Sequence, residues 1–107
     1  MSGSSTRSIT FRAKPPEVFA ALREAARRTG FQFLSGDVDS GTAVFTSGRF
    51  VLGSGEKVTA RIRQGPPGTV EVTLSSDLKF GIVGWSGRRG AGADRFAEAL
   101  SGLLPHA

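Results

Sequence analysis

The most constraining feature of the sequence is a pair of alternating segments joined by a short turn. Residues 56–64 (EKVTARIRQ) and 69–75 (TVEVTLS) place an apolar side chain at nearly every second position, and residues 65–68 (GPPG) lie between them. Alternation of this kind predicts strands with one buried and one solvated face, and the turn residues predict a hairpin. The buried face then requires a covering layer.

The two faces of this hairpin follow from its alternation. We expect six side chains on the inner face: Val58, Ala60, Ile62, Val70, Val72 and Leu74. With the turn centred on Pro66, Arg61 lies opposite Glu71 on the outer face, as an exposed cross-strand pair.

A covering helix is predicted over KPPEVFAALREAARRTG, residues 14–30. Pro15 and Pro16 suit the first helical turn, where their missing N–H groups need no partner. Glu17 complements the positive end of the helix dipole, and Gly30 is a typical helix terminator. The apolar stripe consists of Val18, Phe19, Leu22, Ala25 and Ala26.

The remaining segments complete an α+β pattern. We expect a strand at SITFRA (8–13), a hairpin of FQFLS (31–35) and GTAVFTS (41–47), and a final helix from Gly87 or Arg88 to Leu104. Phe31, Phe33 and Phe45 are expected to face the core, and Leu34 and Val44 the other side.

The element order is therefore β-α-β-β-β-β-α, with an antiparallel sheet and helices packed on one face. Length indicates a single domain over residues 1–107, and the Ser/Gly-rich residues 1–7 are expected to be disordered.

Composition narrows the possible functions. The chain has no cysteine, which excludes disulfides, thiolate metal sites and cysteine nucleophiles. No segment approaches the roughly 20 apolar residues that span a bilayer, and the N-terminus lacks a signal-peptide pattern, so we expect a cytoplasmic protein. The net charge of +5 is explained either by solubility or by an acidic partner such as nucleic acid.

This element order carries a resemblance. With PPEVFAALREAARRTGF, DSGTAVF, EKVTARIR and a GWSGRR segment opening the final helix, the chain resembles small uncharacterised bacterial helix-grip domains. Its topology is similar to that of the TATA-binding-protein-like and START-like fold group. The resemblance implies an apolar ligand held between sheet and helix, and no particular functional residue.

The glycine-rich segment 79–96 raises the question of nucleotide binding. It contains neither G-x-x-x-x-G-K-[ST] nor a complete G-x-G-x-x-G. We interpret it as the connection to the last helix. Arg88 and Arg89 at the helix start have two readings, an anion site formed with free backbone N–H groups or a solvated helix terminus.

Two apolar groups are candidate contact sites. Phe50, Val51 and Leu52 are consecutive, so they form an exposed patch for a protein partner, self-association or an anionic membrane, or else a hairpin tip folded onto the core. Phe80, Ile82 and Trp85 either close the end of the core or line the mouth of an apolar ligand site.

A basic outer sheet face is the remaining candidate. Arg61 and Arg63 are expected there with Arg12 and Lys57, beside threonines and serines, as a nucleic-acid or anion site. Exposed aromatics that would stack on bases are not expected on this face.

No catalytic constellation is found in the sequence. His106 is the only histidine and lies next to the C-terminus, and DVDSG departs from the calcium-loop pattern. We therefore expect no enzyme, no metal and no cofactor. The prediction is a module that binds a small ligand or a protein. The alternative is a non-specific nucleic-acid or anion binder that uses Arg61, Arg63, Arg88 and Arg89.

Overall fold

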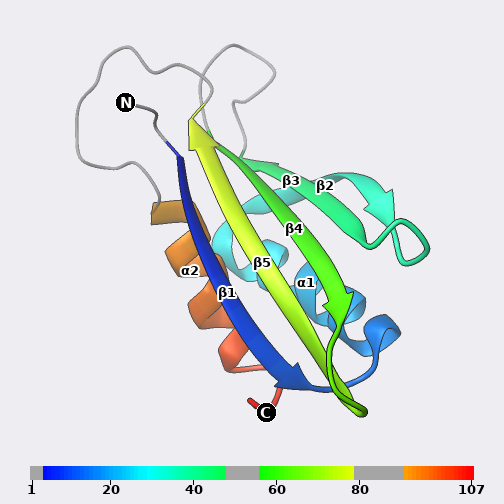
Figure 1. Cartoon of the computed structure of the whole chain (residues 1–107). Coiled ribbons are helices and arrows are strands. Elements are labelled where there is room, and N and C mark those ends of the chain that lie inside the picture. The colour runs from blue at the N-terminus through cyan, green and yellow to red at the C-terminus, as the bar shows by residue number, and fades with distance from the viewer. Residues whose placement is uncertain (1–3, 48–55, 79–90) are drawn as a thin grey trace.

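Two helices cover one face of a five-stranded antiparallel sheet in the computed structural model, which describes residues 4–47, 56–78 and 91–107 (Figure 1). The element order and the α+β class are those expected. In chain order the elements are β1 (Ser4–Arg12), α1 (Pro15–Thr29), β2 (Phe31–Asp37), β3 (Thr42–Ser47), β4 (Glu56–Gln64), β5 (Thr69–Leu78) and α2 (Ala91–Ser101).

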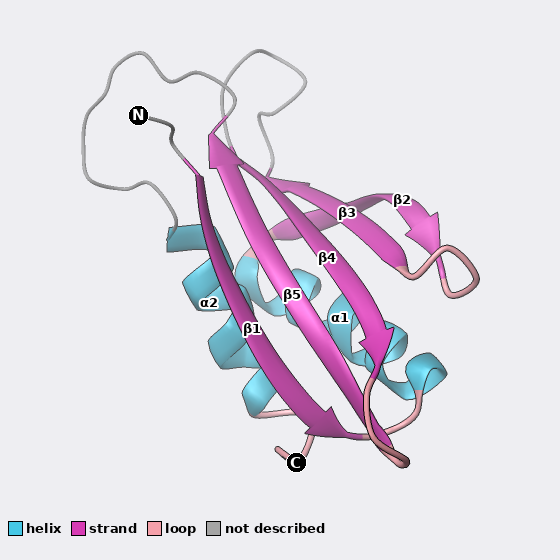
Figure 2. Ribbon diagram, in the orientation of Figure 1, coloured by secondary structure: helices cyan, strands magenta, loops and turns pink. Residues whose placement is uncertain are grey.

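The strands lie in the order β1-β5-β4-β3-β2, and every neighbouring pair is antiparallel. β4 is therefore central, and β1 and β2 are the sheet edges. Both helices lie on the same side of the sheet, which leaves its other side uncovered by either helix (Figure 2). Neither helix among the described residues has the length and apolar character to cross a membrane.

β1 begins at Ser4 rather than at Ser8, so the expectation of disorder is wrong for residues 4–7. These residues pair with residues 74–77 of β5. The segment SSTR has no apolar alternation, but pairing of β1 with β5 is made by the backbone and needs none.

The β4–β5 turn is centred one residue later than expected. Thr69 N–H donates to the Pro66 carbonyl at 2.9 Å, and Gly68 has φ +83°. Proline at the second position and a left-handed glycine at the third are typical of a type II turn, so the turn centres on Pro67–Gly68. Glu71 is consequently opposite Arg63, and the predicted pairing with Arg61 is wrong.

α1 has the predicted ends and the predicted buried stripe. The Glu17 carboxylate accepts the Lys14 backbone N–H at 2.9 Å, and Gly30 caps the other end in the left-handed conformation. The capping contact and the acidic residue in the first turn both favour a helix start at this position.

The core lies between the sheet and the helices and is centred on aromatic rings. The Phe96 ring of α2 lies 5.0 Å from that of Phe45 and 5.6 Å from that of Phe31, centroid to centroid. All six inner-face residues predicted for the β4–β5 hairpin pack in this core, with Ile62 only partly buried. The expected core residue Phe33 packs against Phe45 but remains 39% exposed, because β2 is the sheet edge.

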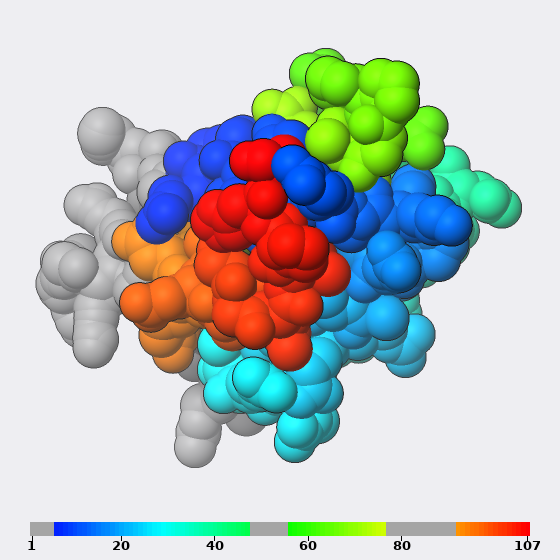
Figure 3. Space-filling view, turned by 90° about the horizontal axis from the view of Figure 1, so that it is seen from below, coloured from blue at the N-terminus to red at the C-terminus, as the bar shows by residue number. Residues whose placement is uncertain are grey.

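α2 ends at Ser101, before the predicted Leu104, where Gly102 begins a turn. The tail then returns to β1. Arg12 N–H donates to the Pro105 carbonyl at 2.8 Å, and Ala107 N–H donates to the Thr10 carbonyl at 3.0 Å. In the view from below, the red C-terminal residues lie against the blue N-terminal ones (Figure 3). The tail thus pairs with one end of the β1 edge.

Candidate functional site

The outer face of β4 carries a row of polar and basic side chains. Lys57, Thr59, Arg61 and Arg63 alternate with the inward-facing residues of the strand, and this polar row is named the β4 row below. Alternate residues of a strand are about 6.7 Å apart, so the β4 row is about 20 Å long. The predicted placement of Arg61 and Arg63 on this face is thereby found in the structure.

Hydroxyl side chains flank Arg61 on both neighbouring strands. Thr42 of β3 and Thr73 of β5 are its direct partners in register, and Ser8 of β1 is the next residue in the same line. The hydroxyls of Ser8 and Thr73 lie 3.0 Å apart, within hydrogen-bond distance. Arg61 therefore lies between hydroxyl-bearing residues in a line across the middle of the sheet.

The two arginines of the β4 row differ in their ionic partners. Arg63 donates to the Glu71 carboxylate at 3.0 Å. Within the described part of the chain, no carboxylate oxygen lies within 4.0 Å of the Arg61 guanidinium. This difference follows from the shift in the β4–β5 turn, which places Glu71 opposite Arg63 instead of Arg61.

A shallow open hollow of about 550 Å³ lies beside these residues. The β2–β3 turn contributes one wall, because the Gly41 carbonyl accepts the Ile62 N–H at 2.8 Å. Asp37 stabilises that turn by accepting the Ser40 N–H at 2.7 Å, a contact that aspartates in turns commonly make. The lining residues are Ser40, Gly41, Thr42, Arg61, Ile62, Arg63, Glu71 and Thr73.

The hollow is lined by two guanidinium groups, three hydroxyl groups and one carboxylate. Guanidinium groups donate to two oxygens of one anion, and hydroxyls add further donors. Among the described residues, no group of three histidines, cysteines or carboxylates could hold a metal ion.

The other predicted site residues lie outside the described residues. They belong to the segment 48–55 between β3 and β4 and the segment 79–90 between β5 and α2. The residues concerned are Phe50, Val51, Leu52, Phe80, Ile82, Trp85, Arg88 and Arg89.

A buried carboxylate at the start of α2 was missed by the sequence analysis. Glu56 is only 8% exposed, and it accepts hydrogen bonds from the Ser76 hydroxyl and, at 2.9 Å, from the Gly92 backbone N–H. A Cβ at position 92 would meet this carboxylate, so any larger residue there requires the Glu56 side chain to move. The Gly92 N–H therefore has its hydrogen-bond acceptor within the protein and is not available to an external anion.

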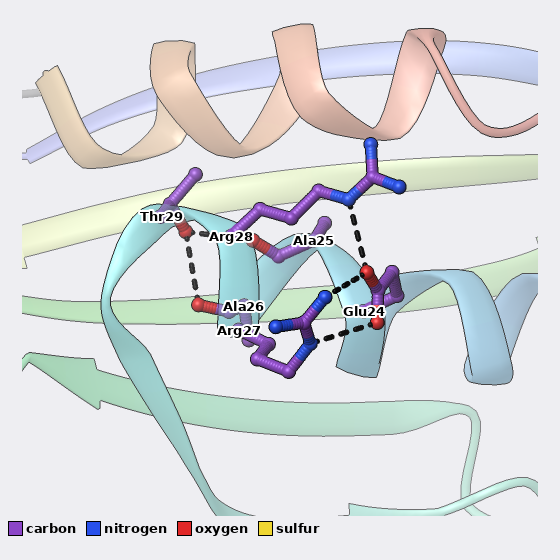
Figure 4. Close-up of polar contacts among 6 residues, drawn as sticks. All are labelled: Glu24, Ala25, Ala26, Arg27, Arg28 and Thr29. Atoms are coloured by element: carbon purple, nitrogen blue, oxygen red, sulfur yellow. Dashed lines mark hydrogen bonds and ion pairs between the residues drawn. The ribbon is translucent and has the colours of Figure 1, made fainter.

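A second basic cluster lies on α1, away from the β4 row. The Glu24 carboxylate accepts from Arg27 at 2.6 Å and from Arg28 at 3.0 Å (Figure 4). These hydrogen bonds, that of Arg27 first, lower the pKa of Glu24 to about 2. Unlike Arg61, both arginines already have a carboxylate partner, so the cluster is a weaker candidate for an anion site.

Solved structures with a similar fold are known, although no sequence match is found. No protein family and no curated protein matches the sequence. An uncharacterised protein from Bacillus thuringiensis is similar in structure, with a TM-score of 0.65 and 9% identity, over 94% of this chain and 95% of that one. XoxI from Bacillus cereus gives a TM-score of 0.61 at 10% identity, over 96% and 93% of the two chains.

A third similar structure is that of a Thermobifida fusca protein, with a TM-score of 0.55 at 10% identity over 98% and 97% of the chains. At these identities the likeness concerns the fold alone, which is shared by uncharacterised small proteins and does not indicate a function.

Proposed function

We propose that the outer face of the sheet binds the phosphate backbone of nucleic acid, independently of sequence and without catalysis. The observation that carries this proposal is the position of Arg61. Arg61 lies in the β4 row, between Thr42 and Thr73 in register, and its guanidinium has no carboxylate within 4.0 Å among the described residues.

The donor types on this face suit phosphate. Arginine forms bidentate hydrogen bonds with phosphate oxygens, and threonine and serine hydroxyls are common backbone contacts in nucleic-acid complexes. The β4 row extends for about 20 Å, which suits a linear polyanion better than a single small anion. The net charge of +5 would increase the rate of encounter with such a polymer.

Among the described residues, this face carries no aromatic ring on which a base could stack. The described phenylalanines pack toward the helices, and even the partly exposed Phe33 has its ring against Phe19 and Phe45. Stacking on exposed aromatic rings is how sheets bind unpaired bases. We therefore expect binding to depend on salt much more than on sequence.

Fluorescence anisotropy with labelled duplex DNA and single-stranded RNA tests the proposal. In about 50 mM salt, Arg61→Ala should weaken binding several-fold. It should also reduce the slope of log affinity against log salt by about 0.7 to 0.9, the loss of one phosphate contact. Arg28→Ala, which removes the same charge from α1, is the matched control and should change affinity little.

Two results would contradict the proposal. One is the absence of binding to either nucleic acid at low salt. The other is an equal effect of Arg61→Ala and Arg28→Ala, because net charge rather than the β4 row would then explain the affinity.

Binding of an apolar ligand or a protein through residues 50–52 and 80–85 stays a second proposal, supported by the apolar sequence of those segments. The helix-grip grouping is likewise proposed, on the strand order and the α2 packing. In the described core, Phe11, Phe45 and Phe96 are fully buried between sheet and helices, where such a ligand would lie.

A further inference from the structure

The edge strand β2 exposes an unusual amount of apolar surface. Within the described ranges it pairs with β3 alone, and every residue from Gln32 to Ser40 is exposed. Two large apolar side chains lie along it, Phe33 at 39% exposure and Leu34 at 55%, and Val38 at 42% lies in the turn that follows. Open apolar edges of this kind are a template for pairing with another chain.

The opposite edge shows how this fold protects a strand. The C-terminal tail pairs with the end of β1, and the inward-pointing Arg7 forms an ion pair with Asp94 at 2.9 Å. Inward charges and covering segments are common devices against edge pairing. From Phe31 to Gly36, β2 contains no charged residue and no proline.

One irregularity limits the length of any ladder on β2. The register with β3 shifts between Phe33 and Ser35, so Leu34 is the extra residue of a β-bulge. Bulges bend a strand and interrupt its regular hydrogen bonding. A strand added to β2 would therefore pair in short stretches on either side of Leu34. We expect the complex between β2 and such a strand to have a dissociation constant in the micromolar range or weaker.

The two ends of β2 carry opposite charges. At its start, the Arg95 guanidinium lies 5.7 Å from the Phe31 ring, and Arg28 is close in sequence. At its end lie Asp37 and Asp39. A strand with this polarity is complementary to an antiparallel copy of itself, whereas an acidic or a basic peptide would be repelled at one end.

We propose that β2 pairs antiparallel with β2 of a second copy, about a two-fold axis near Leu34. Such an interface is isologous, so each contact occurs twice. The acidic end of each copy then faces the basic end of the other, and Leu34 faces its own copy. The proposal does not rest on nucleic-acid binding, because it uses the sheet edge rather than the β4 row.

Sedimentation velocity from about 1 µM to about 1 mM protein tests this pairing. The wild-type chain should show a reversible dimer. Leu34→Lys, which introduces the common protective residue of natural edges, should weaken the dimer at least tenfold. Thr10→Lys adds the same charge at an exposed position of β1 and should leave dimerisation unchanged.

A charge exchange tests the antiparallel direction. Asp39→Arg and Arg95→Glu should each raise the dissociation constant of the dimer about two- to five-fold. The double variant should regain the wild-type dissociation constant. Both residues are exposed, so both variants are expected to fold.

Three outcomes would overturn the proposal. They are a chain that stays monomeric at about 1 mM, a dimer that tolerates Leu34→Lys, and a double variant no tighter than the single ones. The first would leave the edge to a partner of another kind, such as an extended peptide.

Discussion

At the scale of single residues, Glu56 has the clearest structural role. Its buried carboxylate connects the first residue of β4 to Ser76 of β5 and to the Gly92 N–H in α2. A buried charge is costly unless it is hydrogen-bonded, and the positive end of a helix dipole is a favourable place for an anion. Glu56 therefore connects the sheet to α2 through hydrogen bonds.

Glu24 provides a prediction about pH. Its pKa is lowered from 4.5 to about 2 by the hydrogen bonds from Arg27 and Arg28. Because the pKa is lower in the folded state, the stabilisation is fully present above about pH 4.5 and is lost as pH falls through about 2. An NMR titration of the Glu24 carboxyl carbon should show this low midpoint.

The matched variant is the double substitution Arg27→Ala and Arg28→Ala, in which the midpoint should return toward 4.5. A wild-type midpoint near 4.5 would show that the two hydrogen bonds are not maintained in solution.

At the scale of elements, the start of α2 depends on one close approach. Replacing a helical glycine with alanine normally stabilises a helix by up to about 1 kcal/mol. Gly92→Ala should instead destabilise the protein by about 1–3 kcal/mol, because the new methyl group meets the Glu56 carboxylate. Urea denaturation measures the difference.

Gly102→Ala is the control, since the nearest atom to its added Cβ is 3.5 Å away. It should change stability by less than about 0.5 kcal/mol. Glu56→Ala should relieve part of the Gly92→Ala penalty, so that the two costs do not add. If the stability losses of Gly92→Ala and Glu56→Ala simply added, the result would contradict a contact between the new methyl group and the Glu56 carboxylate.

Local patterns were sufficient to predict the elements of this fold. Alternation identified the inner and outer faces of β4 and β5, and the proline, glutamate and glycine positions identified the ends of α1. The register of the β4–β5 hairpin depends on which proline takes the second turn position. A prediction wrong by one residue there placed Glu71 opposite Arg61, whereas the structure places it opposite Arg63.

Long-range contacts were beyond these patterns. Glu56 precedes Gly92 by 36 positions, and a glutamate at a strand start is usually solvated. Only a prior placement of α2 against the sheet end could have predicted its burial. The exposure of Phe33 was missed for a related reason, because alternation identifies a face but not the edge of a sheet.

At the scale of the whole molecule, the two sheet faces and the two sheet edges have different roles. One face packs against both helices, and the other carries the β4 row. One edge is closed at its end by the C-terminal tail, and the other is open among the described residues. This asymmetry predicts a specific effect of removing the tail.

Deletion of residues 105–107 should destabilise the protein by about 2 kcal/mol, because two backbone hydrogen bonds to β1 are lost. It should also produce species larger than a dimer at high concentration. His106→Ala, which keeps the backbone pairing, should remove the edge-to-face contact with Phe11 and the hydrogen bond with the Ser101 hydroxyl, and it should retain the wild-type size. Urea denaturation and light scattering distinguish these effects, and a truncated chain of wild-type size would contradict the prediction.

The paired tail gives the chain the properties of a monovalent building block in polymer chemistry. A unit with a single reactive end combines once and then stops, so raising its concentration increases the number of pairs and not their length. A unit with two reactive ends grows without limit. In this protein, pairing through β2 alone corresponds to the first case, and the backbone contacts that Pro105 and Ala107 make with β1 close the end of the second edge.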